Sequence, residues 1–494
     1  MQIFNTESGR KETFEPLGLP VKMYVCGLTP KDEPHLGHAR LFVINDTIRR
    51  YLEYRGYPVH YIQNFTDIDD KIIAAGLRDG IPAHVAAQRY TESYFRDMDR
   101  LGVRKADEFT YVTQFIPRII EVIAELVEKG HAYVIDGDVY FSVPSFPTYG
   151  KLSKRDEDAM QAGARIEPDA RKHDPRDFAL WKSAKPGEPE WESPWGKGRP
   201  GWHIECSTMA IDKLGPQIDI HGGGSDLIFP HHENEIAQSE SLTGCVPFAR
   251  YWVHTGMLAL PGEEGATEKM AHSGTFVTIR STLEKGDVPP AGLRTYLLGQ
   301  HYRANLVFSE EQLRASVTRW QRWAGARATL IRLISWAGEH RAEGGVPEMG
   351  PAERELTEQI AAARVDFVAA MDDDFNTSGA LSAIDAVAKR ANDYANGLGG
   401  ETASPAALAA LREALAALEE LAGVVGVALE AETFAAGEMD AQSVTAIEAL
   451  LAQRAMARDD KHWAEADRIR KELDEKYHVV IKDTPQGATW SIRE

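Results

Sequence analysis

The run His35-Leu36-Gly37-His38 is the first part of the chain whose residue types and spacing could carry chemistry. It lies between a loop that contains Gly and Pro and a predicted helix. Imidazoles and backbone N–H groups at a helix start can meet triphosphate oxygens, and Gly37 permits close approach. Charge that develops on a phosphate would be stabilised there. The motif taken alone is also compatible with two histidines that cap a helix.

A second candidate group could bind a metal ion. His231 and Glu235 lie four residues apart on a predicted helix and so share one face, a spacing that suits two ligands of one ion. A solvated helix face with an internal contact is the alternative. Thiols added to this pair would make a borderline-soft set of donors that suits zinc, but spacing cannot bring distant cysteines to it.

The elements that must position these residues read as a parallel sheet. Residues 22–26 and 59–65 are predicted strands, and residues 37–54 between them have helical periodicity. This βαβ order predicts an α/β fold with a Rossmann-like catalytic domain and a nucleotide crevice at the strand ends. A strand at 218–220, a Gly-rich loop at 221–224 and a helix at 231–238 predict a second such unit.

Other segments predict an insertion, a bundle and a small terminal domain. Residues 113–129 read as a helix, and residues 132–141 as a hairpin that turns at Asp136-Gly137. Residues from about 152 to 200 are rich in Pro, Gly, Lys and Asp and are expected to be irregular. Beyond about Ser309 the chain predicts an α-helical bundle, and residues 481–490 have strand and turn chemistry.

Composition limits the class of protein. The chain has 494 residues, 43% of them hydrophobic and 26% charged, and no apolar run long enough to span a bilayer, so we expect a soluble protein without a membrane partner. No leader is visible, which predicts a cytoplasmic location. The three cysteines fit a reducing compartment, and Cys245 is expected to be a buried apolar residue. A net charge of -20 argues against binding of nucleic acid unless basic residues gather locally.

Successive blocks of the chain resemble the motifs of the cysteinyl-tRNA synthetases, a family of class I aminoacyl-tRNA synthetases. The blocks are Cys26–Thr29, His35–Arg40, Asn64–Ile72, Gly198–Cys206, His221–Asp226 and Phe229–Glu235. The resemblance implies activation of L-cysteine with ATP and Mg²⁺ and transfer of the cysteinyl group to the 3′ end of tRNA(Cys). It also implies one zinc ion per chain, which binds the substrate thiolate and so rejects serine without editing.

The same resemblance assigns roles to individual residues. It implies that zinc is held by Cys26, Cys206, His231 and Glu235. The phosphates would be contacted by the catalytic residues His35, His38 and Lys269, and the rest of the nucleotide by Gly37, Asp226 and His272. Residues around the amino acid would be Thr66, Trp202 and His221.

One motif departs from the family pattern. The Lys-Met-Ser-Lys-Ser loop is matched by residues 269–276, where Ala271 replaces Ser, His272 replaces the second Lys, and one residue is missing before Gly274. A histidine is mostly neutral near pH 7, so charge stabilisation would rest more on Lys269 or another cation. Either the loop is an active variant or the chain is a paralogue that has lost activation. The intact remaining motifs favour the active variant.

The resemblance also predicts the domains. Residues 1–308 would form the class I catalytic domain, with a connective region inserted at about 113–200, residues 309–435 the bundle, and residues 436–494 the anticodon-binding domain of a monomer. In the tail, basic residues and aromatics such as Arg454, Trp463 and Trp490 suit single-stranded bases. Asp372–Asp374 resemble a bundle element and are expected to make capping and packing contacts.

Three other functions remain open. A cysteine ligase of the mycothiol type shares the catalytic core but lacks the anticodon-reading tail. A noncatalytic tRNA-binding paralogue would explain the altered loop. A structural zinc protein would leave His35–His38 unexplained.

Overall fold

The chain forms two compact units, Met1–Leu429 and Glu430–Glu494. The computed structural model describes residues 1–155, 170–261, 267–269, 277–339, 349–398, 404–430, 441–459, 462–477, 479–484 and 487–492. Among the helices in these ranges, none combines the length and the apolar character that a membrane crossing requires.

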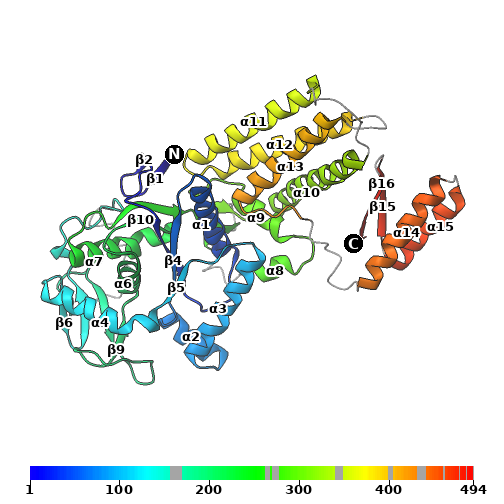
Figure 1. The fold of residues 1–494 in the computed structure, drawn as a ribbon. Helices are drawn as coiled ribbons and strands as arrows, with labels where there is room; N and C mark the ends of the chain where they lie inside the picture. Colours follow the sequence, from blue (N-terminus) through cyan, green and yellow to red (C-terminus); the bar gives the residue numbers. More distant parts are fainter. Residues whose placement is uncertain are drawn as a thin grey trace. The chain divides into compact units, whose positions relative to one another are not determined.

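A parallel sheet lies at the centre of the first unit (Figure 1). Its strands, in spatial order, are β11 (Ala249–Thr255), β10 (Ile218–Gly224), β3 (Val21–Leu28), β4 (Val59–Phe65) and β5 (Glu108–Tyr111). Every neighbouring pair is parallel, and α1 (Leu36–Tyr54) joins β3 to β4. The predicted βαβ unit and the Rossmann-like α/β fold are confirmed.

Further helices and short strands flank this sheet. Between β4 and β5 lie α2 (Asp70–Asp79) and α3 (Ala83–Arg100). After β11 come β12 (Leu258–Pro261) and β13 (Thr267–Lys269), and β12 also pairs with β14 (Leu306–Val307). The helices α8 (Ile279–Leu283) and α9 (Pro290–Leu298) then lead into the bundle.

The insertion contains a sheet of its own. It begins with α4 (Val112–Glu128) and continues as an antiparallel sheet of β6 (Ala132–Ile135), β7 (Asp138–Phe141), β8 (Phe178–Ser183) and β9 (Gly198–Pro200). The predicted hairpin is confirmed, with φ of 52° at Asp136 and 87° at Gly137. The expectation that residues 152–200 are wholly irregular is wrong. Buried Phe178 and Leu180 anchor β8, while the Pro- and Gly-rich flanks hide this short strand in the sequence pattern.

The prediction of a Gly-rich loop at residues 221–224 is also wrong, because β10 continues through Gly222, Gly223 and Gly224. Glycine is needed there for close packing: a Cβ on Gly223 would lie 2.6 Å from Cε1 of His232. The strand is followed by the short turn η2 (Ser225–Leu227), the π-helical turn η3 (Ile228–His232) and the helix α7 (Glu233–Thr243).

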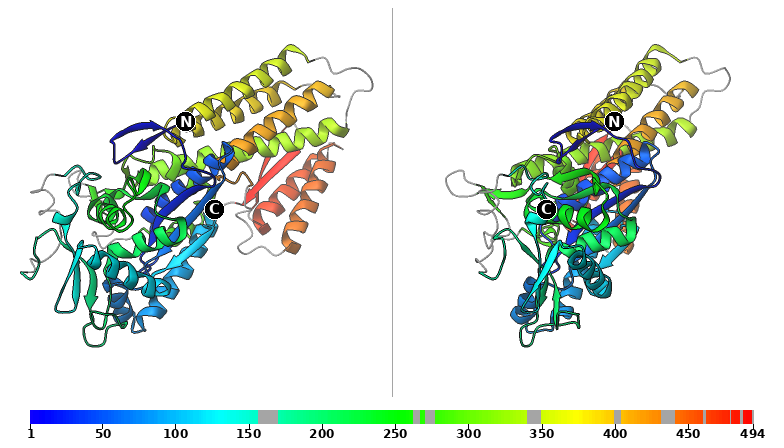
Figure 2. Two further views of the ribbon diagram at one scale, coloured as in Figure 1. Left: turned by 60° about the vertical axis from the view of Figure 1, so that its left-hand side comes forward. Right: turned by 90° about the vertical axis from the view of Figure 1, so that its left-hand side faces the viewer.

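A helical bundle completes the first unit, with its long helices running side by side (Figure 2). The helices are α10 (Glu310–Glu339), α11 (Pro351–Asp372), α12 (Thr377–Gly397) and α13 (Pro405–Val424). One apolar cluster extends from the sheet into the bundle, and it includes Val43 of α1, Leu293 of α9, Phe367 of α11 and Leu418 of α13. The sheet and the bundle therefore share a core.

The corner between α11 and α12 attaches the N-terminal hairpin, which consists of β1 (Gln2–Asn5) and β2 (Arg10–Thr13). Oδ1 of Asp374 accepts hydrogen bonds from the Phe4 N–H at 2.8 Å and the Tyr302 hydroxyl at 2.8 Å. Its Oδ2 accepts one from Nε of Arg303 at 2.7 Å. The packing role expected of Asp372–Asp374 is confirmed.

The second unit is small and mixed. It contains α14 (Ala441–Asp459), α15 (Trp463–Tyr477) and the antiparallel strands β15 (Val479–Thr484) and β16 (Gly487–Ile492). Ile447, Ile469 and Leu473 form its apolar core. Arg454, which was expected to contact bases, is only 6% exposed, whereas Trp463 is 59% exposed.

Candidate metal and nucleotide site

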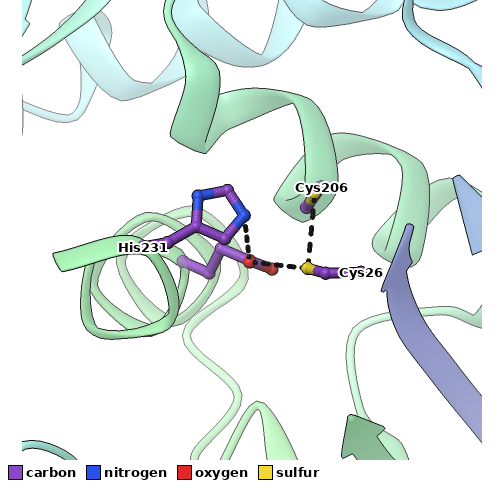
Figure 3. Close-up of side chains that lie close together, drawn as sticks. Cys26, Cys206 and His231 are labelled. Atoms are coloured by element: carbon purple, nitrogen blue, oxygen red, sulfur yellow. Dashed lines mark hydrogen bonds and ion pairs between the residues drawn. The ribbon is translucent and has the colours of Figure 1, made fainter. Parts of the chain in front are cut away.

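The four predicted metal ligands converge in the interior (Figure 3). Cys26 lies in β3, Cys206 in α6 (Trp202–Leu214), His231 in η3 and Glu235 in α7. The two sulfur atoms are 3.6 Å apart, and Cys26 Sγ lies 3.4 Å from Oε1 of Glu235. Nε2 of His231 is 3.0 Å from the same oxygen. All four donor atoms lie within 4.8 Å of one another, and all four residues are buried.

Strand register places three rings on the sheet beside Cys26, which is two residues along β3 from Tyr24. His221 of β10 pairs with Tyr24 of β3 on one side and Trp252 of β11 on the other, so these rings share one face of the sheet. Just beyond them, a Cβ at Gly27 would lie 1.6 Å from the backbone oxygen of Asn64. Only glycine therefore lets β3 continue past Cys26 at this distance from β4.

The neighbours of each donor set its charge. A hydrogen bond from Cys26 lowers the pKa of Cys206 to about 6, whereas burial raises the pKa of Cys26 well above its ordinary value. Burial opposes a charge on His231, but the Glu235 carboxylate and Cys206 outweigh it and raise the pKa of His231 to about 10. Burial would also raise the pKa of Glu235, but His221 and His231 hold it well below its usual range.

This donor set fits zinc. Zinc bonds of about 2.0–2.3 Å in a tetrahedron place its ligand atoms roughly 3.3–3.8 Å apart. The separations of 3.6, 3.4 and 3.0 Å between the donor atoms are close to those edges. A second set of close donors replaces Cys206 and His231 with His221 and His232. The first set, with two sulfurs, matches the preference of zinc better.

Of the residues predicted to surround the amino acid, His221 and Trp202 contact this group, whereas Thr66 contacts the neighbouring Glu205. Nε2 of His221 is 2.9 Å from Oε2 of Glu235, and the His221 ring stacks on Trp252 at a centroid distance of 4.4 Å. Trp202 stacks on His231 at 4.2 Å. The Thr66 hydroxyl donates to Oε2 of a neighbouring carboxylate, Glu205, at 3.0 Å.

Sequence reasoning missed three histidines of this layer, of which His232 and His254 are buried and His203 is half-buried. Nδ1 of His203 lies 2.9 Å from Nδ1 of His231, and Nδ1 of His232 lies 2.8 Å from Nε2 of His254. His203 and His232 belong to the quoted motif blocks, so their blocks could have indicated them. His254 lies within an ordinary strand pattern, and nothing in its sequence context marks it.

His35 and His38 start α1 and cap it. Nδ1 of His35 accepts hydrogen bonds from the Gly37 and His38 N–H groups at 3.1 and 3.4 Å, and Nδ1 of His38 accepts one from the His35 N–H at 3.3 Å. Burial, together with the charge of Lys31, lowers the pKa of His35 to about 4, and burial holds the pKa of His38 well below its usual range. Neutral rings whose Nδ1 atoms accept must carry hydrogen on Nε2. The two histidines can therefore cap the helix through Nδ1 and still have an N–H on Nε2 that could donate to a phosphate.

The structure describes only some of the other residues that were predicted to contact the nucleotide. Asp226 lies in η2, and its charge acts on the pKa of His35 against the effect of burial. The backbone of Lys269 ends β13, opposite Ala259 of β12. The Lys269 side chain and His272 lie outside the described residues. Cys245, expected to be buried, is partly exposed because it follows the end of α7 in a surface turn.

Comparison with known proteins agrees with this geometry. Residues 14–318 match the catalytic domain of class I tRNA synthetases of the C type, residues 366–430 match the DALR domain, and residues 443–490 match the anticodon-binding domain of cysteinyl-tRNA ligases. The chain belongs to the cysteinyl-tRNA synthetase family. A relative from Heliobacterium modesticaldum named cysteine–tRNA ligase is 49% identical, over 99% of both chains. One of the same name from Moorella thermoacetica is 47% identical, also over 99% of both.

Solved structures share the fold of this family member at lower identity. The methionyl-tRNA synthetase of Mycobacterium tuberculosis bound by methionyl-adenylate has a TM-score of 0.60 and 16% identity, and covers 84% of this chain and 92% of its own. The leucyl-tRNA synthetase of an Agrobacterium radiobacter ternary complex has a TM-score of 0.56 and 14% identity, and covers 84% of this chain and 85% of its own.

Proposed function

We propose that the chain is a cysteinyl-tRNA synthetase, which activates L-cysteine with ATP and transfers it to the 3′ end of tRNA(Cys). The observation that carries this proposal is the convergence of Cys26, Cys206, His231 and Glu235 within 4.8 Å. These residues would hold one zinc ion. When bound, zinc supplies a site for the thiolate of cysteine that the hydroxyl of serine fills poorly.

The remaining residues orient the reactants. Neutral His35 and His38 would donate from Nε2 to the phosphates of ATP, which brings Mg²⁺, and Gly37 would let the nucleotide approach the start of α1. Asp226 would contact the ribose. Lys269 is proposed to supply a cation at the phosphates, with His272 beside it in the altered loop.

Other residues would bind cysteine and exclude water. Trp202 covers His231, and His221 fixes one oxygen of Glu235, so both are proposed to shape the space around the amino acid. Thr66 is proposed to line the same space. Positioning of the two reactants then accounts for much of the rate.

The domain assignment is also proposed. Residues 1–308 would be the catalytic domain with a connective region at about 113–200 and the altered loop at 269–276, residues 309–435 the bundle, and residues 436–494 the anticodon reader. The match of residues 443–490 to an anticodon-binding domain supports tRNA over the amino sugar of a mycothiol-type ligase. The protein is proposed to act as a cytoplasmic monomer.

Metal content and cysteine-dependent exchange of pyrophosphate into ATP test the proposal. Wild-type protein is expected to contain about one zinc per chain and to exchange with cysteine but not serine. Cys206→Ser should lose zinc and most of its preference for cysteine, whereas Cys245→Ser, at a partly exposed thiol, should resemble wild type. Exchange that is absent in zinc-loaded wild type would instead support a noncatalytic tRNA-binding paralogue.

A further inference from the structure

The N-terminal hairpin contacts the layer of buried rings behind the proposed metal ligands. Thr6 directly follows β1, and its Oγ1 lies 2.8 Å from Nδ1 of His254. Nε2 of His254 lies 2.8 Å from Nδ1 of His232. His254 and His232 are 5% and 0% exposed. A line of polar atoms therefore runs from the hairpin to the ring beside Glu235.

Backbone contacts fix the hairpin against β11. The Thr6 N–H donates to the Trp252 oxygen at 3.0 Å, and the Trp252 N–H donates to Oδ1 of Asn5 at 3.1 Å. The side-chain amide of Asn5 also donates to the Arg250 oxygen at 3.1 Å. These bonds hold the Thr6 hydroxyl in register with His254, which is in the same strand as Trp252.

These contacts couple the positions of hydrogen on the two rings, and a hydroxyl can either donate or accept. The negative charge of Glu235 favours an N–H on Nε2 of His232, and that arrangement requires Thr6 to donate to Nδ1 of His254. A neutral imidazole has one donor and one acceptor nitrogen. If Thr6 donates to Nδ1 of His254, then Nε2 of His254 carries hydrogen and donates to Nδ1 of His232. His232 must then carry its own hydrogen on Nε2.

That nitrogen faces the metal group. Nε2 of His232 is 3.9 Å from Oε1 of Glu235, and it has no hydrogen-bond partner within the part of the chain that the structure describes. An N–H there attracts the carboxylate, whereas a lone pair repels it. His221 already fixes Oε2 of Glu235. The tautomer of His232 therefore contributes to how firmly Oε1 is held, in addition to the closer contacts of His231 and Cys26.

We propose that Thr6 is a positioning residue: its hydroxyl donates to Nδ1 of His254, stabilises the tautomers of His254 and His232 that direct an N–H toward Glu235, and thereby helps to hold this carboxylate in the geometry that binds zinc. This inference rests on the proposed zinc centre. Partners behind metal ligands commonly tune metal affinity, even though they do not touch the ion. Thr6 extends that support to a hairpin distant in sequence from all four ligands.

The test compares Thr6→Val, which removes the hydroxyl and keeps the shape, with Thr6→Ser, which restores it. Thr13→Val is the matched control, because Thr13 lies on β2 of the same hairpin and is exposed. Full-length zinc-loaded proteins are mixed with a chelator, and the rate of zinc release is followed. Thr6→Val is expected to release zinc about tenfold faster than wild type, with Thr6→Ser and Thr13→Val within about twofold.

The exchange reaction gives a second readout. Thr6→Val should raise KM for cysteine and lower the preference for cysteine over serine, and leave KM for ATP unchanged. Zinc release at the wild-type rate in Thr6→Val would overturn the inference, as would equal acceleration in Thr13→Val. Wild-type protein without zinc would overturn the proposed metal centre as well. A zinc-loaded wild type that fails to activate cysteine would overturn the proposed function alone.

Discussion

At the scale of single residues, two cysteine thiols whose sulfur atoms are 3.6 Å apart have pKa values that are shifted in opposite directions. Burial raises the pKa of Cys26, whereas the hydrogen bond from Cys26 lowers the pKa of Cys206 to about 6. The sequence could predict both as ligands only through motifs, since 180 positions separate them. Their relative charge depends on which thiol donates to the other, and no spacing rule contains that information.

Asp97 in α3 is a buried carboxyl group whose ionisation lowers the stability of the folded protein. It is 0% exposed, and neither carboxylate oxygen has a hydrogen-bond partner among the described residues. Burial, together with the charge of Glu33, raises the pKa of Asp97 to about 6. The folded protein therefore binds this proton more tightly than the unfolded chain does, so ionisation of Asp97 lowers stability as pH rises from about 4 to 6.

Replacing Asp97 by Asn should remove that cost. We expect Asp97→Asn to raise the free energy of unfolding by about 1–2 kcal/mol at pH 7.5 and to lose most of this advantage toward pH 4, where Asp97 is protonated in the folded protein and about half protonated in the unfolded chain. Urea unfolding at the two pH values measures the difference. Asp99→Asn, two residues along on the exposed side of α3, is the control. A gain for Asp97→Asn that does not change with pH would contradict the explanation.

At the scale of elements, segments with a clear apolar pattern were predictable and segments without one were not. The helix at 37–54 and the strand at 59–65 appear within one residue of their predicted limits, because each has a clear apolar pattern. The strand β8 lies among Pro and Gly residues, and β10 continues through three glycines, which lack side chains to show a period. Tertiary pairing decides both cases.

In the corner between α11 and α12, the carboxylate of Asp374 accepts hydrogen bonds from the strand β1 and from residues 302 and 303. Asp374 has φ of 61°, in the left-handed region that Asn also tolerates. Asp374→Asn should therefore keep the backbone and lose the charged partner of Arg303, at a cost of about 2 kcal/mol. Asp373→Asn should cost less than about 0.5 kcal/mol, since its ion pair with Lys11 is exposed. Urea unfolding compares them, and equal losses would disprove the special role of Asp374.

At the scale of the whole molecule, we propose that amino-acid activation and recognition of the anticodon belong to separate compact units. All four proposed zinc ligands lie within Met1–Leu429, whereas Trp463 lies in Glu430–Glu494. The sequence predicted a small mixed domain at the end of the chain. The sequence could not show which basic residues face outward: Arg454 is expected from its motif to contact bases, but its side chain is buried.

An exposed tryptophan offers a test of this division. Trp463 is 59% exposed, and a ring in that setting can stack on an unpaired base. We expect Trp463→Ala to lower kcat/KM for tRNA by about tenfold and to leave cysteine-dependent exchange unchanged. Met456→Ala, at a residue 67% exposed in the same unit, is the control. Loss of exchange activity in Trp463→Ala would contradict the division of roles.

The apolar cluster shared by Val43, Leu293, Phe367 and Leu418 has a consequence for dissecting the protein. A chain cut after Phe308 would yield two pieces, each with a bare apolar face that only the other can cover. We expect residues 1–308 and 309–494 to precipitate when produced singly and to reassemble into a nicked, active protein when produced together. Recovery of both fragments through a tag on one of them would measure that complementation.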